Sequence, residues 1–189
     1  MSPAISFLSL TALTVFLVVL CLSFILFGFF IFWEIWEYAF RKNSYFYPTA
    51  SRELEKIFGR LDIKNKKYFY DLGCGDGRTL KLASRLFPKL IVIGYEINPF
   101  LCLCNCFSAK TRGLKITVKR QSFYQARLEN NSLIYIFLNP EAIKRLEPKL
   151  TRLKNSIIIS HGFEIPYFRQ FLDKKLEGEP FSTYIYKLG

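Results

Sequence analysis

Three glycines alternate in a short segment that begins with an acidic residue. The segment reads Tyr70-Asp71-Leu72-Gly73-Cys74-Gly75-Asp76-Gly77. Strand-prone aromatic residues precede it and apolar residues at helical spacing follow it, so we expect it to join a strand to a helix. Glycine suits such a turn because it accepts positive φ angles and lets a ligand approach the backbone closely. The N–H groups at a helix start are unpaired, and the segment therefore predicts a nucleotide-type binding loop.

A second acidic residue supports a ligand that contains a ribose. Glu96 stands about twenty residues after the loop, where a carboxylate can accept hydrogen bonds from both ribose hydroxyls. The dinucleotide fingerprint G-x-G-x-x-G would place its third glycine one residue later than Gly77. The strict alternation instead resembles motif I of class I S-adenosylmethionine-dependent methyltransferases. The alternatives are a glycine turn that binds nothing and, for Glu96, a neighbour of a helix cap.

This resemblance implies that S-adenosylmethionine is the cofactor and that the loop holds its methionine and ribose part. The implied cofactor-binding residues are Asp71, Gly73, Cys74, Gly75, Gly77, Glu96, Gln121 and Ser122. Methyltransferases often have an acidic residue after the third strand that contacts the adenine amino group. Gln121 and Ser122 stand there instead, and an ordinary loop is the alternative at these two positions.

Asn139 and Pro140 follow the fourth predicted strand. Many amino-group methyltransferases have a polar-proline motif here, which accepts a hydrogen bond from the substrate amine. By this resemblance Asn139 and Pro140 are the predicted catalytic residues, although they match only the first half of the motif. The alternative is a helix that Asn139 caps and Pro140 opens, and the two roles are compatible.

The N-terminal part of the chain differs from the rest. It has no charged side chain from Met1 to Trp33. A helix over residues 5–33 would be about 43 Å long, more than the roughly 30 Å of a bilayer's hydrocarbon core. The expected interfacial aromatic belt consists of Trp33, Trp36, Tyr38 and Tyr45. Arg41 and Lys42 then predict a single-pass membrane protein with its catalytic domain on the cytoplasmic (or mitochondrial matrix) side.

The charge distribution suggests which partners the chain has. All 27 Lys and Arg residues lie after residue 40, together with 13 of the 15 Asp and Glu residues. We expect the lipid bilayer and its anionic headgroups as partners, and we do not expect a nucleic acid. The five cysteines have no zinc-ligand spacing, so we expect no metal site.

The remainder of the chain alternates strand and helix patterns, which predicts a parallel sheet with helices on both faces. We expect an α/β fold, a Rossmann-like class I methyltransferase sheet, preceded by one transmembrane helix. The predicted parts are the helix and belt at 1–40, an amphipathic connecting segment at 41–66 and the S-adenosylmethionine-binding domain at 67–189. Near the C-terminus we expect a helix at 166–174, a sixth strand near 175–177 and an antiparallel finish.

Nearly the whole chain resembles one group of small methyltransferases. The likeness rests on the apolar anchor, Tyr47-Pro48-Thr49, the glycine loop, Gly94-Tyr95-Glu96-Ile97-Asn98-Pro99, the proline after the fourth strand, and Thr183-Tyr184-Ile185-Tyr186. These features are similar to the membrane-anchored lysine methyltransferases typified by the ATP synthase c-subunit lysine N-methyltransferase. The resemblance implies a membrane-protein substrate that presents a lysine. The alternatives are an RNA or small-molecule methyltransferase and a non-catalytic S-adenosylmethionine-binding protein.

Overall fold

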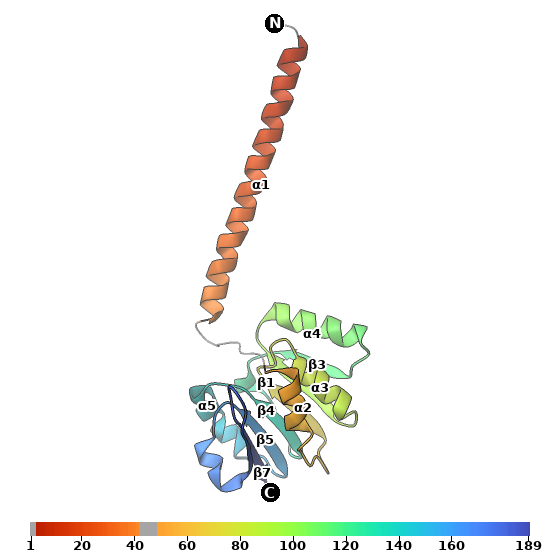
Figure 1. Ribbon diagram of the computed structural model, residues 1–189, viewed down its shortest axis with the longest axis vertical. Helices are drawn as coiled ribbons and strands as arrows, with labels where there is room; N and C mark the ends of the chain where they lie inside the picture. The colour runs from red at the N-terminus through yellow and green to blue at the C-terminus, as the bar shows by residue number, and fades with distance from the viewer. Residues whose placement is uncertain (1–2, 42–48) are drawn as a thin grey trace. The chain divides into compact units, whose positions relative to one another are not determined.

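The computed structural model describes residues 3–41 and 49–189, and the side chains of 11–33 and 49–189. It divides into two units, Met1–Phe46 and Tyr47–Gly189, which are described separately (Figure 1). The first unit contains one helix, α1 (Pro3–Arg41). Of the sequence predictions, Lys42, Tyr45, Tyr47 and Pro48 lie outside the described residues.

A segment of α1 from Thr11 to Trp33 is long and apolar enough to cross a membrane. It has 23 residues, a mean hydropathy of 3.0, and none of it is buried. A signal sequence near an N-terminus can meet the same criteria of length and composition. The predicted apolar helix is therefore present. Its length and composition are those of a membrane span and also those of a signal sequence.

The second unit is built on a seven-stranded sheet in the order β3-β2-β1-β4-β5-β7-β6. The strands are β1 (Tyr68–Leu72), β2 (Ile91–Glu96), β3 (Ile116–Arg120), β4 (Ser132–Ile136), β5 (Ser156–His161), β6 (Leu172–Leu176) and β7 (Thr183–Leu188). Strands β1 to β5 are parallel, and β7 runs antiparallel to both β5 and β6. Leu72 pairs with Tyr95 and with Ile136, so the carboxyl ends of three strands meet at one edge. This confirms the predicted fold class.

Helices cover both faces of the sheet (Figure 1). They are α2 (Ser51–Phe58), α3 (Arg78–Leu86), α4 (Pro99–Thr111) and α5 (Pro140–Leu150), with short 3₁₀ helices η1 (Phe123–Gln125) and η2 (Pro166–Phe171). Successive residues of β1 point to opposite faces: Phe69 packs with α2 and α3, whereas Tyr70 packs with α5. The helices and the strand alternation thus bury both faces of the central strands.

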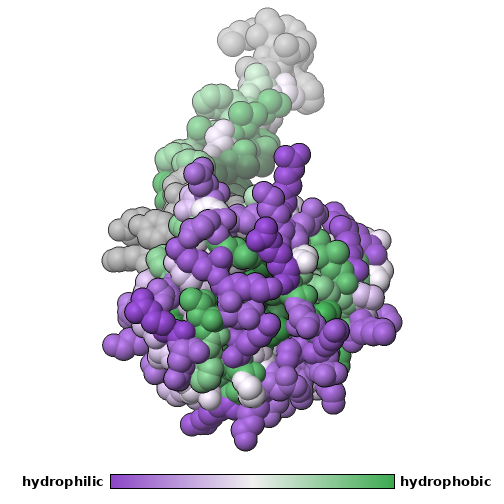
Figure 2. Space-filling model, turned by 60° about the horizontal axis from the view of Figure 1, so that its bottom comes forward, coloured by the Kyte–Doolittle hydropathy of each residue, from purple (hydrophilic) through white to green (hydrophobic). Residues whose placement is uncertain are grey.

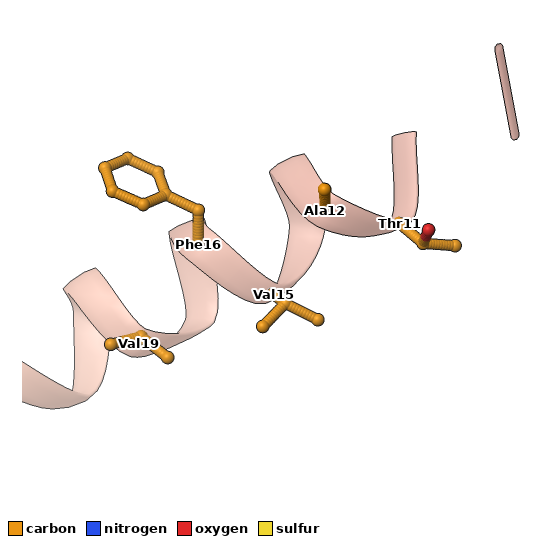
Figure 3. Close-up of a pocket in the computed structure, with 5 residues that line it drawn as sticks. All are labelled: Thr11, Ala12, Val15, Phe16 and Val19. Carbon is orange, nitrogen blue, oxygen red and sulfur yellow. The ribbon is translucent and has the colours of Figure 1, made fainter. Parts of the chain in front are cut away.

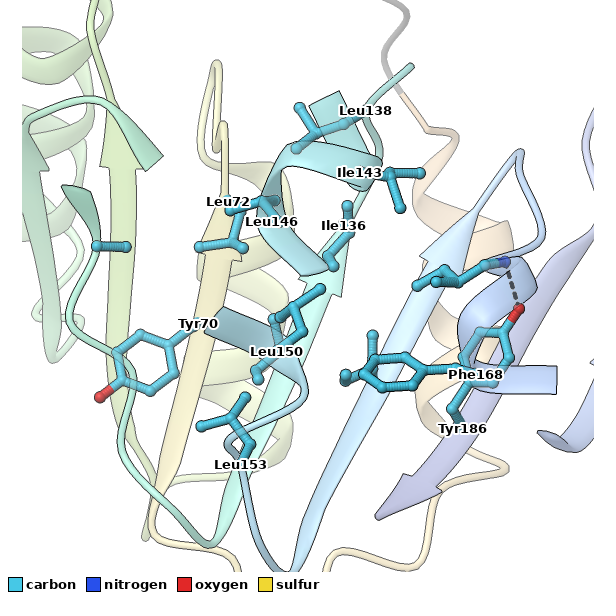
Figure 4. Close-up of a cluster of buried hydrophobic side chains, with 14 of the residues drawn as sticks. Tyr70, Leu72, Ile136, Leu138, Ile143, Leu146, Leu150, Leu153, Phe168 and Tyr186 are labelled. Carbon is cyan, nitrogen blue, oxygen red and sulfur yellow. Dashed lines mark hydrogen bonds between the residues drawn. The ribbon is translucent and has the colours of Figure 1, made fainter. Parts of the chain in front are cut away.

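The cluster under α5 joins the sheet to the C-terminal hairpin (Figure 4). Leu146 and Leu150 of α5 are almost fully buried in it, as are Phe168 and Tyr186. The Tyr186 hydroxyl accepts a hydrogen bond of 2.7 Å from the backbone N–H of Ile165. This contact satisfies a polar group that would otherwise be buried without a partner.

The predicted helix at 166–174 is wrong in its second half. The chain forms the 3₁₀ helix η2 only to Phe171 and then enters strand β6, which begins earlier than the predicted sixth strand. Strand β6 pairs along β7, and an ion pair of 3.2 Å joins Asp173 to Lys187. Pairing with a strand later in the chain therefore overrides the local helical pattern, which contains no information about that partner.

Candidate active site

The glycine loop lies at the carboxyl end of β1, as predicted. Gly73, Gly75 and Gly77 have φ angles of 93°, 50° and 70°, a left-handed backbone that residues with a Cβ rarely adopt. The N–H groups of Gly73 and Cys74 both donate to the Tyr95 carbonyl at 3.0 Å. The loop is thereby fixed to the end of β2, and its alternating glycines bring the backbone to the edge where α/β folds bind ligands.

Glu96 lies beside this loop at the end of β2. Its Oε2 accepts the Gly75 N–H at 2.9 Å, and its Oε1 accepts the Asn98 N–H at 2.8 Å. A carboxylate has about four acceptor positions, so both oxygens retain capacity for ligand hydroxyls. The structure brings Glu96 and the loop together, and Glu96 also fixes the loop's conformation.

Asn105 is a residue at this site that the sequence analysis missed. It lies on the inner side of α4, is 2% exposed, and donates from Nδ2 to the Gly75 carbonyl at 2.8 Å. Its Oδ1 has no hydrogen-bond partner among the described residues. A Cβ built on Gly77 would collide with that Oδ1. In the sequence, only its position as a lone asparagine among the apolar residues of α4 could have indicated this role. Asn105 is a positioning residue for the loop.

A second set of contacts joins the loop to the chain before α2. Arg78 bonds to both carboxylate oxygens of Asp76, with 2.6 Å between Nη2 and Oδ2. The same guanidinium donates from Nη1 to the Thr49 carbonyl at 3.1 Å. The hydroxyls of Thr49 and Tyr135 lie 2.9 Å apart in the interior. Thr49 therefore lies at the site edge, although it precedes the sheet in sequence.

Asp71 is the buried acid at the end of β1. Burial and, to a smaller extent, the nearby charges of Glu96 and Asp76 together raise its pKa to about 8, against the opposing effect of a side-chain hydrogen bond with Thr79. Asp71 without a ligand is thus held largely protonated at neutral pH. A cationic ligand group placed next to it would favour the ionised form.

Cys74, also a predicted cofactor-binding residue, has its side chain in the core. It is 5% exposed and packs among the apolar residues between the sheet and α3. Burial raises the pKa of its thiol, which therefore stays protonated. Any contact of Cys74 with a ligand must come from its backbone.

Gln121 and Ser122 follow β3 beside the same edge. The Gln121 N–H donates to the Glu96 carbonyl at 3.0 Å, and the Ser122 hydroxyl accepts the Tyr124 N–H at 3.3 Å. A Cβ built on Gly73 would lie 3.9 Å from the Phe123 ring and 3.4 Å from Leu138. The apolar neighbours of the loop thus come from the segments that follow β3 and β4. An adenine contact by Gln121 or Ser122 stays a prediction.

Asn139 and Pro140 lie where β4 leads into α5. The Asn139 Oδ1 accepts the Ala142 N–H at 2.8 Å, and Pro140 is the first helical residue. The capping role is therefore present. The amide of Asn139 is exposed at the carboxyl edge and keeps its two N–H donors and a second lone pair. Its contact with an acceptor amine stays a prediction.

The glycine loop and Glu96 lie in the part of the chain that is similar to a known family. The sequence model of the ANTKMT methyltransferase domain matches residues 71–171, which is more than half of the chain. The chain belongs to this methyltransferase family. It is therefore an S-adenosylmethionine-dependent methyltransferase, and the family resemblance stated from the sequence is confirmed.

Individual relatives of this ANTKMT-family chain support the assignment. A protein-lysine N-methyltransferase of Saccharolobus islandicus is 26% identical over 124 residues, covering 64% of this chain and 77% of that protein. The structure is similar to an RNA methyltransferase from Salinibacter ruber in complex with S-adenosyl-L-homocysteine, with a TM-score of 0.63 and 23% identity, covering 75% and 94% of the two chains. TehB from Haemophilus influenzae has a TM-score of 0.54 at 14% identity, covering 74% and 61%. The two structures show the shared fold.

The residues of this family member fit S-adenosylmethionine. The positive φ angles of the loop open a backbone cradle, Glu96 bonds to the Gly75 N–H within it, and Asp71 lies close enough to Glu96 for their charges to interact. The bound cofactor supplies an electrophilic methyl group. Glu96 would bind the ribose hydroxyls, Asp71 would accept from the ammonium end, and Phe123 and Leu138 would exclude water beside Gly73.

The raised pKa of Asp71 predicts that ligand binding is coupled to proton release. Because the pKa of Asp71 in the folded chain lies above its ordinary value of 3.8, the folded chain retains a proton that the unfolded chain loses. The contribution of Asp71 to stability therefore falls as pH rises between about 4 and 8. An ammonium group near Asp71 reverses this preference and expels the proton. At pH 7 the native chain should release up to about one more proton per bound S-adenosylhomocysteine than Asp71→Asn. Calorimetry in phosphate and in Tris, which differ in ionisation enthalpy, measures this, and equal proton counts for both proteins would exclude Asp71 as the ammonium partner.

Proposed function

We propose that this chain is a membrane-tethered protein-lysine N-methyltransferase. Its acceptor would be a lysine of a membrane protein at the bilayer boundary. The observation that carries the proposal is an apolar, fully unburied 23-residue segment of α1 in the same chain as an ANTKMT methyltransferase domain. The name of the S. islandicus relative, a protein-lysine N-methyltransferase, supports lysine as the acceptor.

The surface of α1 supports a lipid environment. A hollow lined by Thr11, Ala12, Val15, Phe16 and Val19 runs along its side (Figure 3). All five residues belong to a single helix, so this hollow is a shallow groove between neighbouring, mostly apolar side chains. Arg41, the last residue of α1, and the basic residues beyond it would place the methyltransferase domain on the cytoplasmic or matrix side.

Anchoring would serve the reaction by raising the local concentration of substrate. An enzyme and an acceptor held in one membrane plane meet at a high effective concentration without any additional contact. A soluble acceptor would gain nothing from this arrangement. The basic domain surface would also be attracted to anionic headgroups at about 1 kcal/mol per residue near the surface.

The chemistry needs an acceptor amine with a free lone pair. Neutralising a lysine of pKa about 10.4 at pH 7 costs roughly 4.6 kcal/mol in water. A neighbouring positive charge and a desolvated site both lower that pKa, so no strong protein base is required. In this proposal the Asn139 amide oxygen accepts an amine N–H, which orients the nitrogen for in-line attack.

The test is transfer of labelled methyl groups to a membrane extract. The full chain should label a membrane protein, and hydrolysis should yield methylated lysine. A fragment starting at Arg41 that binds S-adenosylhomocysteine normally should label the same protein at least about tenfold more slowly at equal concentration, given the usual gain from tethering. Equal labelling would refute a targeting role for α1. Label in RNA or in small molecules would instead favour the alternative substrates that the basic surface allows, and no transfer would favour a binding protein.

A further inference from the structure

Helix α4 presents large apolar side chains to solvent along its outer side. Phe100, Leu103 and Phe107 are 65%, 69% and 69% exposed, and Ile97, just before the helix, is 55% exposed. The spacing of three and four residues places the three helical positions on one face. The opposite face, with Cys102, Asn105 and Ala109, is buried against the sheet.

Such a surface is unusual for a soluble protein. Scattered apolar residues need no explanation, but a contiguous row of phenylalanine and leucine marks an interaction surface. The face of the domain that Figure 2 shows is largely hydrophilic, with smaller hydrophobic patches between the hydrophilic residues. Among residues 49–189 none covers these side chains, so within the domain the outer face of α4 is open to a partner.

Basic residues predominate in α4 and in the segment that follows it. From residue 97 to residue 128 the chain has six basic residues and no Asp or Glu. Lys110, Arg112 and Lys115 are exposed at and beyond the C-terminal end of α4. At the other end both Glu96 and Arg120 lie near Cys102: burial and the Glu96 carboxylate raise the pKa of its thiol, and the Arg120 guanidinium lowers it. Positive charge thus flanks the apolar row at its C-terminal end, and both signs of charge lie near its N-terminal end.

We infer that the outer face of α4 is a docking surface for an anionic lipid bilayer. An apolar face next to exposed basic residues is the pattern of helices that lie in the membrane interface. A second copy of this chain is a poorer occupant, because pairing across α4 would bring two sets of basic residues together. The inference rests on the proposed membrane tether, since Arg41 ends α1 only eight residues before Thr49.

The consequence concerns the position of the active site. Helix α4 starts directly after Glu96 and Asn98, at the edge where the glycine loop and Asn139 lie. A bilayer beneath α4 would hold that edge next to the headgroups. An acceptor lysine would then be recognised at the membrane surface rather than on a distant soluble domain.

The test uses the full chain in vesicles of phosphatidylglycerol and phosphatidylcholine. An environment-sensitive fluorophore is attached to Cys104, which is exposed on α4, after Cys21 and Cys106 are changed to serine. In the control chain Cys104 is also changed to serine, and the fluorophore is attached to Lys144→Cys, at an exposed position of α5. Nitroxide lipids with the quencher near the headgroup should remove most of the Cys104 signal, whereas the Lys144 position should be unaffected.

Each outcome decides the inference. Changing Phe100, Leu103 and Phe107 together to glutamine should abolish the quenching, and pure phosphatidylcholine should reduce it. An unquenched Cys104 label in chains that sediment with vesicles and bind S-adenosylhomocysteine would overturn the docking surface alone. Chains that fail to sediment would overturn the tether and this inference together. If the fluorescence of the Cys104 label instead changes with the number of protein chains per vesicle, and not with quencher lipid, the occupant of the α4 face is a second copy of the chain. That result would refute docking to the bilayer.

Discussion

Replacing Glu96 with alanine is expected to weaken S-adenosylhomocysteine binding by about 1.5 to 3 kcal/mol, roughly ten- to 150-fold. The carboxylate holds the Gly75 N–H at 2.9 Å and the Asn98 N–H at 2.8 Å, and it retains acceptor positions for the ribose hydroxyls. Its loss therefore removes ligand contacts and also releases the loop. Calorimetric titration of the full chain measures the affinity.

A fragment ligand separates the two roles of Glu96. 5′-Methylthioadenosine keeps the ribose and adenine but lacks the amino-acid part. If Glu96 acts on the ribose, Glu96→Ala should weaken both ligands by a similar factor; if it acts only through the loop, S-adenosylhomocysteine should be weakened more. Glu141→Ala is the matched control, because that carboxylate is exposed on α5 and pairs with Arg145. Unchanged affinity in Glu96→Ala would remove Glu96 from the site.

Replacing Gly77 with alanine is expected to destabilise the loop by about 2 to 5 kcal/mol. The left-handed φ of 70° accounts for about 1 to 2 kcal/mol of this, and the contact with Asn105 for about 1 to 3 kcal/mol. Asn105 cannot simply move away, because it is 2% exposed and bonded to the Gly75 carbonyl. The free energy of unfolding and the affinity for S-adenosylhomocysteine should both fall.

A double-mutant cycle tests the contact with Asn105. In an Asn105→Ala background the collision is absent, so Gly77→Ala should cost only the backbone term, and the two substitutions should be less than additive by about 1 to 3 kcal/mol. Gly113→Ala is the control, because Gly113 has a φ of 62° and open space around its Cα. Gly113→Ala should be additive with Asn105→Ala. Additivity in the Gly77 cycle as well would show that Asn105 does not constrain the loop.

The sequence by itself determined the parts of this protein that depend on local pattern. Alternating glycines at Gly73, Gly75 and Gly77 indicate positive φ angles wherever they occur, and all three have them. The position of Glu96 at the carboxyl end of β2 could be predicted because the end of a parallel strand fixes where the next residues lie. The long apolar run predicted α1 for the same reason: composition and period need no distant partner.

Only the tertiary structure decided the contacts between residues far apart in the chain. Asn105 reaches the Gly75 carbonyl across 30 positions, and Thr49 reaches Tyr135 across 86. Strand β6 replaced the last residues of a predicted helix because its partner β7 lies later in the chain. The direction of each side chain, including the exposure of Phe100 on α4, depends on which elements pack against it. A local pattern contains residue types and spacing but not the packing partner, and the packing partner is what fixes burial and contact.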